Sequence, residues 1–346
     1  MEEEMVEALL FGDKEAQVLA ARELGKSTSK QRHKLAERGV IAPLVSMLHA
    51  QDYEAIEAAL FALLSLAFGS ERFINHTQNK IRIAQSEAIP GLLKVLQCQT
   101  ELFDLAIAAL LILSSCTANK LAIAASGAIQ LLVEILYSHY PDDNYNDNDN
   151  DNITISLQAK LDIISTLHNL STCHQIIPSI VSSATVISLL QLINASEKSS
   201  ELVEKAMALL EKIVSSSEIA LKETAGTEGA IQLLVEAVEE GSPQCQEHAV
   251  GILLPICKSC RHRYRGMILR EGAMPGLLQL SVDGARRAKE KAKALLQLLR
   301  DRSGCTTRGK QSKNALLEQG MRQIDRGERA GETLRLVEGM IAKLRT

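Results

Sequence analysis

A short apolar phrase that recurs along the chain constrains its fold more than any other feature. In the clearest copy, residues 228–238, apolar side chains follow Ile231 at offsets of three, four, six and seven residues. The same spacing starts at five further anchors, which are Ile41, Ile89, Ile129, Met274 and, less regularly, Val186. Successive anchors are 48, 40, 57, 45 and 43 residues apart. This period indicates stacked helical units, each too small to bury its apolar face alone.

The residues around each anchor predict that a helix begins there. The four offsets place the apolar side chains on one helical face. A glycine precedes four of the anchors by two residues, at Gly39, Gly127, Gly229 and Gly272. Glycine at this point suits the end of the preceding helix, where the backbone turns through positive φ. Proline falls in the first turn of three copies, where its missing N–H costs nothing.

The remaining sequence of each unit predicts a long helix rich in Ala and Leu, followed by a shorter one. We expect the long helices at residues 54–68, 102–116, 157–173, 200–215, 244–260 and 285–300. Residues 1–12 predict an N-terminal capping helix, and residues 13–302 an all-α array of about six to seven repeats. Leu110 lies within a long helix and is expected in the core, where truncation to Ala costs about 2–5 kcal/mol.

Three segments depart from the repeat. Residues 140–152 are rich in Asp and Asn with almost no apolar content, which predicts a disordered acidic insert. Residues 303–314 are polar and predict a linker. Residues 315–346 predict an amphipathic helix that packs on the last repeat or self-associates, since Leu334, Val337, Ile341 and Leu344 share one stripe.

The composition excludes several classes of protein. No run of about 18 apolar residues occurs, so we expect no membrane span. The N-terminus has no basic and apolar secretory signal, and seven Cys without framework spacing favour a reduced, intracellular protein, with cytosol and nucleus both open. The chain carries no P-loop, Rossmann, nucleophile-elbow or metalloprotease motif, so we predict a non-enzyme without cofactor.

Two short motifs have a chemical interpretation beside a plainer one. Cys257 and Cys260 have a redox or zinc spacing, but no further ligands lie at partner spacing, and two thiols on a helix explain them. Asp147, Asp149 and Asp151 alternate as at the start of a calcium loop. The glycine and the glutamate that such a loop needs are replaced, so no metal site is predicted.

The charge distribution is strongly asymmetric. Residues 257–313 carry 15 Lys and Arg against 4 Asp and Glu, whereas residues 1–256 carry 17 against 33. The candidate basic patch contains Arg261, Arg263, Arg286, Arg287, Lys289 and Lys291, with Arg265, Arg270 and Lys293 nearby. The patch is either a solvated helix face that ends the array or a contact for an acidic protein, a nucleic-acid backbone or an anionic lipid, and our hypothesis is an acidic partner. Aromatic residues for base stacking are missing there apart from Tyr264, which argues against nucleic acid.

The chain resembles armadillo-repeat proteins, and among them the plant group that usually carries a U-box. The resemblance lies in the repeated phrases, in Asn79-Lys80 and Asn119-Lys120 ahead of two of them, and in residues 272–292, which are similar to the closing repeat of that group. It covers roughly residues 13–300. A right-handed superhelix with a concave groove for protein partners is implied. The repeats begin almost at once, so the ligase activity of a preceding U-box is not carried over.

The resemblance also implies that the long helices line the groove. Asn169 matches the family pattern in which an amide faces the groove. The aligned positions in the other units are Ser65, Ile112, Lys212, Pro255 and Leu298, and we select Ser65, Asn169 and Lys212 as candidate partner-binding residues. The chain has no Trp, which argues against import-signal binding. The expected function is a scaffold for extended protein segments, and the alternative is substrate recognition in ubiquitination beside a separate ligase.

Overall fold

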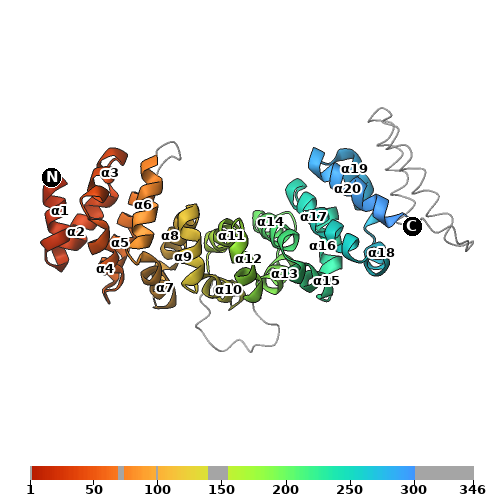
Figure 1. Cartoon of the computed structure of the whole chain (residues 1–346), viewed down its shortest axis with the longest axis horizontal. Helices are drawn as coiled ribbons and strands as arrows, with labels where there is room; N and C mark the ends of the chain where they lie inside the picture. Colours follow the sequence, from red (N-terminus) through yellow and green to blue (C-terminus); the bar gives the residue numbers. More distant parts are fainter. Residues whose placement is uncertain (1, 69–73, 99, 139–154, 301–346) are drawn as a thin grey trace, which may run out of the picture. The chain divides into compact units, whose positions relative to one another are not determined.

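The computed structural model describes residues 2–68, 74–98, 100–138 and 155–300, and the regular structure within these ranges is entirely helical. The chain divides into two compact units, Met1–Ser183 and Ala184–Thr346. Figure 1 labels the helices of each unit in chain order. The predicted insert at 140–152, the linker at 303–314 and the C-terminal helix at 315–346 lie outside the described residues.

Unit 1 begins with a helical pair and then follows the predicted repeat. Its α-helices are α1 (Glu2–Phe11), α2 (Lys14–Gly25), α3 (Ser29–Glu37), α4 (Ile41–Leu48), α5 (Tyr53–Ala67), α6 (Ile74–Gln85), α7 (Ala88–Cys98), α8 (Phe103–Ser114), α9 (Lys120–Ala125), α10 (Ala128–Ser138), α11 (Leu157–Ser171) and α12 (Ile177–Ser182). Short 3-10 turns precede three of them, at η1 (Thr100–Leu102), η2 (Thr117–Asn119) and η3 (His174–Ile176).

Unit 2 continues the same plan. Its helices are α13 (Thr185–Ala195), α14 (Glu201–Ser216), α15 (Glu218–Gly226), α16 (Ala230–Glu240), α17 (Pro243–Ser259), α18 (Arg261–Arg270), α19 (Met274–Asp283) and α20 (Arg286–Leu299). The phrase helices of the chain are therefore α4, α7, α10, α13, α16 and α19, and the long helices of its repeats are α5, α8, α11, α14, α17 and α20.

The predicted long helices are confirmed, with ends that differ by a few residues. The largest differences are two residues, at the C-terminal ends of α8 and α11, and Leu102 belongs to the 3-10 turn η1 instead of α8. Within unit 1, α2 packs against α5, α5 against α8, and α8 against α11. Within unit 2, α14 packs against α17, and α17 against α20. Within their units, α5, α8 and α17 are thus each packed between two such helices, as a solenoid requires.

The turn before each phrase helix has the predicted left-handed backbone. The four glycines at this position have φ between 75° and 86°. In the two phrases that lack glycine, Glu87 and Ala184 occupy the position with φ of 63° and 56°. The fold therefore requires a residue with left-handed backbone at this position, even where a Cβ atom makes that backbone unfavourable.

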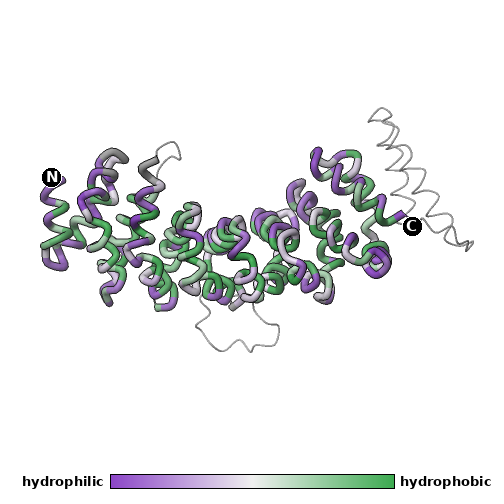
Figure 2. Tube along the Cα trace, viewed as in Figure 1, coloured by the Kyte–Doolittle hydropathy of each residue, from purple (hydrophilic) through white to green (hydrophobic). Residues whose placement is uncertain are grey.

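The core consists of aliphatic side chains and small residues. In Figure 2 hydrophobic and hydrophilic segments alternate along the helices of each unit. Leu110 in α8 is fully buried, as predicted. Alanine lies at many of the contacts between long helices, for example Ala59 and Ala106, and its small side chain lets neighbouring units approach closely.

Candidate functional site

The long helices share one incompletely buried stripe along their length. The aligned positions Ser65, Ile112, Asn169, Lys212, Pro255 and Leu298 are all half-buried. Most residues one turn before or after these positions are likewise exposed or half-buried, although Gly251, one turn before Pro255, is buried. The opposite side of each helix is buried. The stripe is therefore the side of the long helices that remains available to other molecules.

On α5 and α8 the stripe is largely apolar, and on α5 it carries exposed aromatic rings. Phe61 is 48% exposed and Phe68, which follows the end of α5, is 68% exposed. Leu64 of α5 and Leu111 of α8, which each immediately precede an aligned position, are half-buried. Large apolar side chains in such an arrangement are typical of interaction surfaces.

The apolar stripe extends from α5 onto α2. Arg22 of α2 forms ion pairs with Glu54, at 3.2 Å, and with Glu57, at 3.9 Å. Glu57 lies one turn before Phe61, and Leu19, which is 64% exposed, lies one turn before Arg22. The ion pairs therefore place Leu19 and Phe61 on the same side of the α2–α5 pair.

Sequence reasoning missed these phenylalanines because it searched for polar groove residues. The chain has five Phe, and none of the four in the described residues is buried. Phenylalanine is ordinarily among the residues most often found in a core. The signal was present in the sequence, since the core positions of the repeat are filled by Leu, Ile, Val and Ala and leave the rings unassigned.

The predicted groove residues join neighbouring long helices. Ser65 donates its hydroxyl hydrogen to the Gly25 carbonyl, at 3.1 Å, which links α5 to α2. Asn169 donates from Nδ2 to Ser114 Oγ, at 3.0 Å, which links α11 to α8. Lys212 is half-buried on α14. The hydrogen bond to Ser114 thus orients the amide of Asn169, whose side chain is half-buried.

The two Asn-Lys pairs close the ends of the long helices. Asn119 is buried, and its Nδ2 donates to the Lys80 carbonyl, at 3.0 Å, and to the Leu113 carbonyl, at 3.2 Å. Asn79 likewise donates to the Leu66 carbonyl at 3.0 Å. Carbonyls at a helix C-terminus lack intrahelical partners, so these amides stabilise the ends of α8 and α5.

The basic residue after each asparagine reaches the next long helix. Lys80 donates to Ser115 Oγ at 2.8 Å, and Lys120 to Thr172 Oγ1 at 2.6 Å. The equivalent position in other repeats holds Arg32 and Arg265, which donate to the carbonyls of Ser65, at 2.7 Å, and Leu299, at 2.9 Å. A cation at a helix C-terminus is favourable. These residues are therefore explained by packing.

Unit 2 carries a cluster of charged side chains on its stripe, which we call the clasp. Glu211 of α14 accepts hydrogen bonds from Lys291 Nζ of α20, at 2.8 Å, and lies 2.7 Å from His248 Nδ1 of α17. Lys291 also lies 3.5 Å from Glu247 Oε1. The four side chains are only 20–26% exposed. The clasp links three successive long helices.

The clasp crosses α17 at a glycine. A Cβ atom on Gly251 would lie 1.8 Å from Glu211 Oε1 and 3.0 Å from Lys291 Nζ. Burial favours the neutral form of Glu211, but hydrogen bonds from His248 and Lys291 outweigh it and lower the pKa of this carboxyl below its usual value. The missing side chain of Gly251 thus makes room for an ionised carboxylate.

The structure separates the predicted basic patch into four groups. Arg261 donates to the carbonyls of Leu298 and Arg300, so it caps the end of α20 together with Arg265. Lys291 belongs to the clasp. Arg263 is exposed on α18, with its guanidinium 5.3 Å from the centre of the Tyr264 ring.

Arg286, Arg287 and Lys289 lie at the opposite end of α20 from Arg261. They begin the helix, whereas Arg261 contacts its final turn. At a rise of about 1.5 Å per residue the two ends are about 20 Å apart. The basic residues near the start of α20 are therefore a surface of their own.

Cys257 and Cys260 do not share the environment that a redox or metal site requires. Cys257 is buried and Cys260 is exposed. Burial raises the pKa of the Cys257 thiol, which favours the unreactive protonated form. Within the described ranges no three His, Cys, Asp or Glu side chains are placed to hold a metal ion. The acidic triplet at Asp147, Asp149 and Asp151 lies outside those ranges.

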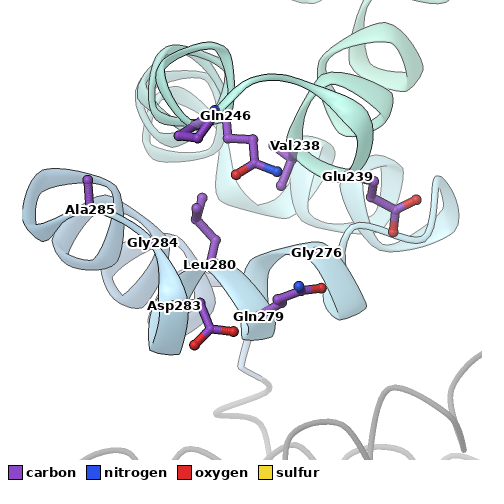
Figure 3. A pocket seen from close by; sticks show the side chains of 10 residues that line it. Val238, Glu239, Gln246, Gly276, Gln279, Leu280, Asp283, Gly284 and Ala285 are labelled. Carbon is purple, nitrogen blue, oxygen red and sulfur yellow. The ribbon is translucent and has the colours of Figure 1, made fainter. Parts of the chain in front are cut away.

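A cleft of about 170 Å³ lies between the end of α16, the start of α17 and the α19–α20 turn. Figure 3 shows Leu280 and Gln246 pointing toward this space, whereas the Asp283 carboxylate points away from it. The polar groups of the cleft do not converge on a common point, so the cleft lacks this feature of a specific small-molecule site.

No single helix in the described part of the chain combines the length and hydropathy needed to cross a bilayer. Two sharply bent helix pairs meet those criteria by length and composition only.

Comparison with known families agrees with the repeat architecture. Residues 148–314 match the family model of the plant U-box protein ARM repeat region. U-box domain-containing protein 45 of Arabidopsis thaliana is 27% identical over 302 residues, which cover 86% of this chain and 34% of that protein. U-box domain-containing protein 17 of the same plant is 28% identical over 312 residues, covering 88% and 39%. The chain thus spans less than half the length of these relatives.

Solved structures support the same fold. The crystal structure of an engineered protein superposes with a TM-score of 0.70 at 19% identity, covering 99% of this chain and 78% of that one. Such low identity shows the fold alone. The helical repeat, the matched family model and these relatives together show an armadillo-repeat fold that is similar to the ARM repeat region of plant U-box proteins.

Proposed function

We propose that the chain is a non-enzymatic scaffold that binds extended segments of partner proteins along the stripe of its long helices. The observation that carries this proposal is the placement of Phe61 and Phe68, which are 48% and 68% exposed beside half-buried leucines. Exposed aromatic rings on a rigid surface are typical anchors of binding energy. Each ring would gain up to about 1.5–3 kcal/mol on complete burial.

The polar residues of the stripe would fix the direction of the bound segment. Asn169 is held by Ser114, and its oxygen can accept from a main-chain N–H of the partner. Ser65 and Lys212 lie at the aligned positions on α5 and α14 and are proposed contacts of the same kind. Because the helices are already packed, binding would cost little reorganisation.

A library of random 12-residue peptides displayed on phage provides the test, since the natural partner is not needed. Peptides selected on the wild type should bind the double variant Phe61→Ala/Phe68→Ala at least about tenfold more weakly, because about 1.4 kcal/mol corresponds to a factor of ten. Phe11→Ala/Leu157→Ala removes two exposed apolar side chains elsewhere and is the matched control. Equal binding by both double variants would reject the stripe as the binding surface.

A second candidate function is substrate recognition in protein ubiquitination. The observation that favours it is the match to the ARM repeat region of plant U-box proteins. In this function the repeats would recognise the substrate, and a U-box would supply the ligase activity. With purified ubiquitin, activating and conjugating enzymes, this chain alone should form no ubiquitin chains. Affinity purification from plant cells should recover a ligase if this second function holds, and other proteins only if it does not.

A further inference from the structure

Four basic side chains in the first eight residues of α20 form no hydrogen bond or ion pair with another helix in the described residues. Arg286 and Arg287 are exposed, and Lys289 and Lys293 are half-buried. Lys291, on the same helix, is held in the clasp, and Arg261 and Arg265 cap the other end of the helix. We call Arg286, Arg287, Lys289 and Lys293 the α20 basic face.

The basic face is electrostatically unfavourable for the helix that carries it. The first turn of α20 contains no acidic residue, so its cations lie near the positive end of the helix dipole. Arg286 and Lys289 are three residues apart, and Lys289 and Lys293 four, which brings like charges together on the helix surface. The ion pair between Arg286 Nε and Glu290 Oε1, at 3.2 Å, is exposed and offsets little of this.

The helix forms despite this repulsion because its other side is buried. Ala288, Ala292, Leu295, Leu296 and Leu299 pack into unit 2 and are completely buried. Their burial fixes the basic side chains on the outer side of the helix. A local charge arrangement that opposes folding and is not compensated within the fold points to a contact with another molecule.

We propose that the α20 basic face binds an acidic segment of a partner protein. Arg286 and Lys293 are seven residues apart, which is about 10 Å along the helix. An extended chain advances about 3.3 Å per residue, so carboxylates at alternate positions over four to five residues would match this spacing. Charge complementarity supplies the attraction, and it weakens as salt increases.

An acidic protein segment fits this face better than nucleic acid or a membrane. Among the described residues no exposed aromatic side chain accompanies the cations for base stacking, since Tyr264 on α18 is buried. The apolar side chains of α20 are buried in unit 2, so the face has no apolar part to enter a bilayer. The proposal does not depend on the apolar stripe, which lies on other helices.

A fluorescein-labelled deca-glutamate peptide is a suitable probe, measured by fluorescence anisotropy with the full chain at about 50 mM salt. The variant Arg286→Glu/Arg287→Glu/Lys289→Glu should bind at least about tenfold more weakly than the wild type. Its melting temperature should equal or exceed that of the wild type, because glutamate near a helix N-terminus is favourable. A merely structural role for these cations predicts the opposite, a lower melting temperature.

The control variant is Lys258→Glu/Arg263→Glu/Arg270→Glu, which makes the same change in net charge at exposed positions outside the face. It should bind the peptide within about threefold of the wild type if location decides the interaction. Equal weakening by both variants, or no binding by the wild type, would overturn the proposal. Tighter binding of an oligothymidine or of phosphatidylserine vesicles, lost in the first variant only, would overturn the assignment to a protein segment.

Discussion

Lys291 of α20 reaches Glu211 of α14 across the intervening helix α17, with 2.8 Å between Nζ and Oε1. The two residues are 80 positions apart in the chain. They meet above Gly251, where α17 has no side chain to separate them. Pro255 lies one turn further along α17 and removes the N–H that would bond to the Gly251 carbonyl. The clasp therefore bridges α17 where the helix's own hydrogen bonding is weakened.

Gly251→Ala should destabilise unit 2 by about 1–2 kcal/mol, because the new Cβ displaces a half-buried ion pair. Alanine in an unconstrained helix interior would instead stabilise by about 0.5–1 kcal/mol relative to glycine. The same substitution in a Glu211→Ala background should therefore change sign and stabilise. Denaturant unfolding of the four proteins checks this, and destabilisation in both backgrounds would show that the clasp is not the reason for the glycine.

The stability contributed by Glu211 should depend on pH. Burial raises its pKa, but the hydrogen bonds from His248 and Lys291 prevail and lower the pKa in the folded protein. A carboxyl with a lowered folded pKa stabilises above its unfolded pKa, about 4.3, and loses that contribution as pH falls through the folded value. The stability gap between wild type and Glu211→Gln should be complete at pH 7 and shrink below about pH 4. An unchanged gap over this range would contradict the ion pair.

Glycine at the two left-handed positions that lack it should stabilise the fold. A left-handed backbone costs a residue with a side chain about 1–2 kcal/mol, and glycine avoids this cost. Glycine also loses about 0.5–1 kcal/mol more conformational entropy on folding, so Glu87→Gly and Ala184→Gly should each raise the free energy of unfolding by about 0.5–1 kcal/mol. Gly229→Ala is the reverse control, because φ is 75° there and a Cβ would have no neighbour within 4 Å. It should lose a similar amount in thermal unfolding. Destabilisation by both glycine variants would contradict this account.

Leu110→Ala should cost about 2–5 kcal/mol, since the side chain is fully buried in α8, which packs against α5, α7 and α11, and its truncation leaves a cavity. Leu157→Ala on α11 is the matched control, because Leu157 is 63% exposed. That change should stay within about 0.5 kcal/mol of the wild type. Calorimetric melting of both variants tests the difference, and equal melting temperatures would exclude Leu110 from the core.

The thiols should differ sharply in reactivity. Burial raises the pKa of Cys245 to about 11 and also raises that of Cys257, whereas Cys98 and Cys260 are exposed. Iodoacetamide at about pH 8 should therefore modify Cys98 and Cys260 in the folded protein and spare Cys245 and Cys257 until it unfolds. Peptide mass spectrometry locates the modified residues. A disulfide between Cys257 and Cys260 in the folded protein would contradict this distribution.

The sequence by itself determined the repeat, the order of helices and the position of each turn. These depend on local rules, namely apolar spacing, a left-handed residue before each phrase and proline in a first turn. The long helices were consequently found to within a few residues. Even the irregular phrase at Val186 folds as expected, with Ala184 taking the left-handed backbone that glycine takes elsewhere.

Only the tertiary structure decided what the charged and aromatic side chains do. Arg261 and Lys291 belong to one basic run in the sequence, yet the first caps a helix and the second neutralises a carboxylate on α14. Phe61 lies in an apolar helix but outside the core. These outcomes depend on which residues of successive repeats become neighbours, and stacking brings together positions that no local pattern links.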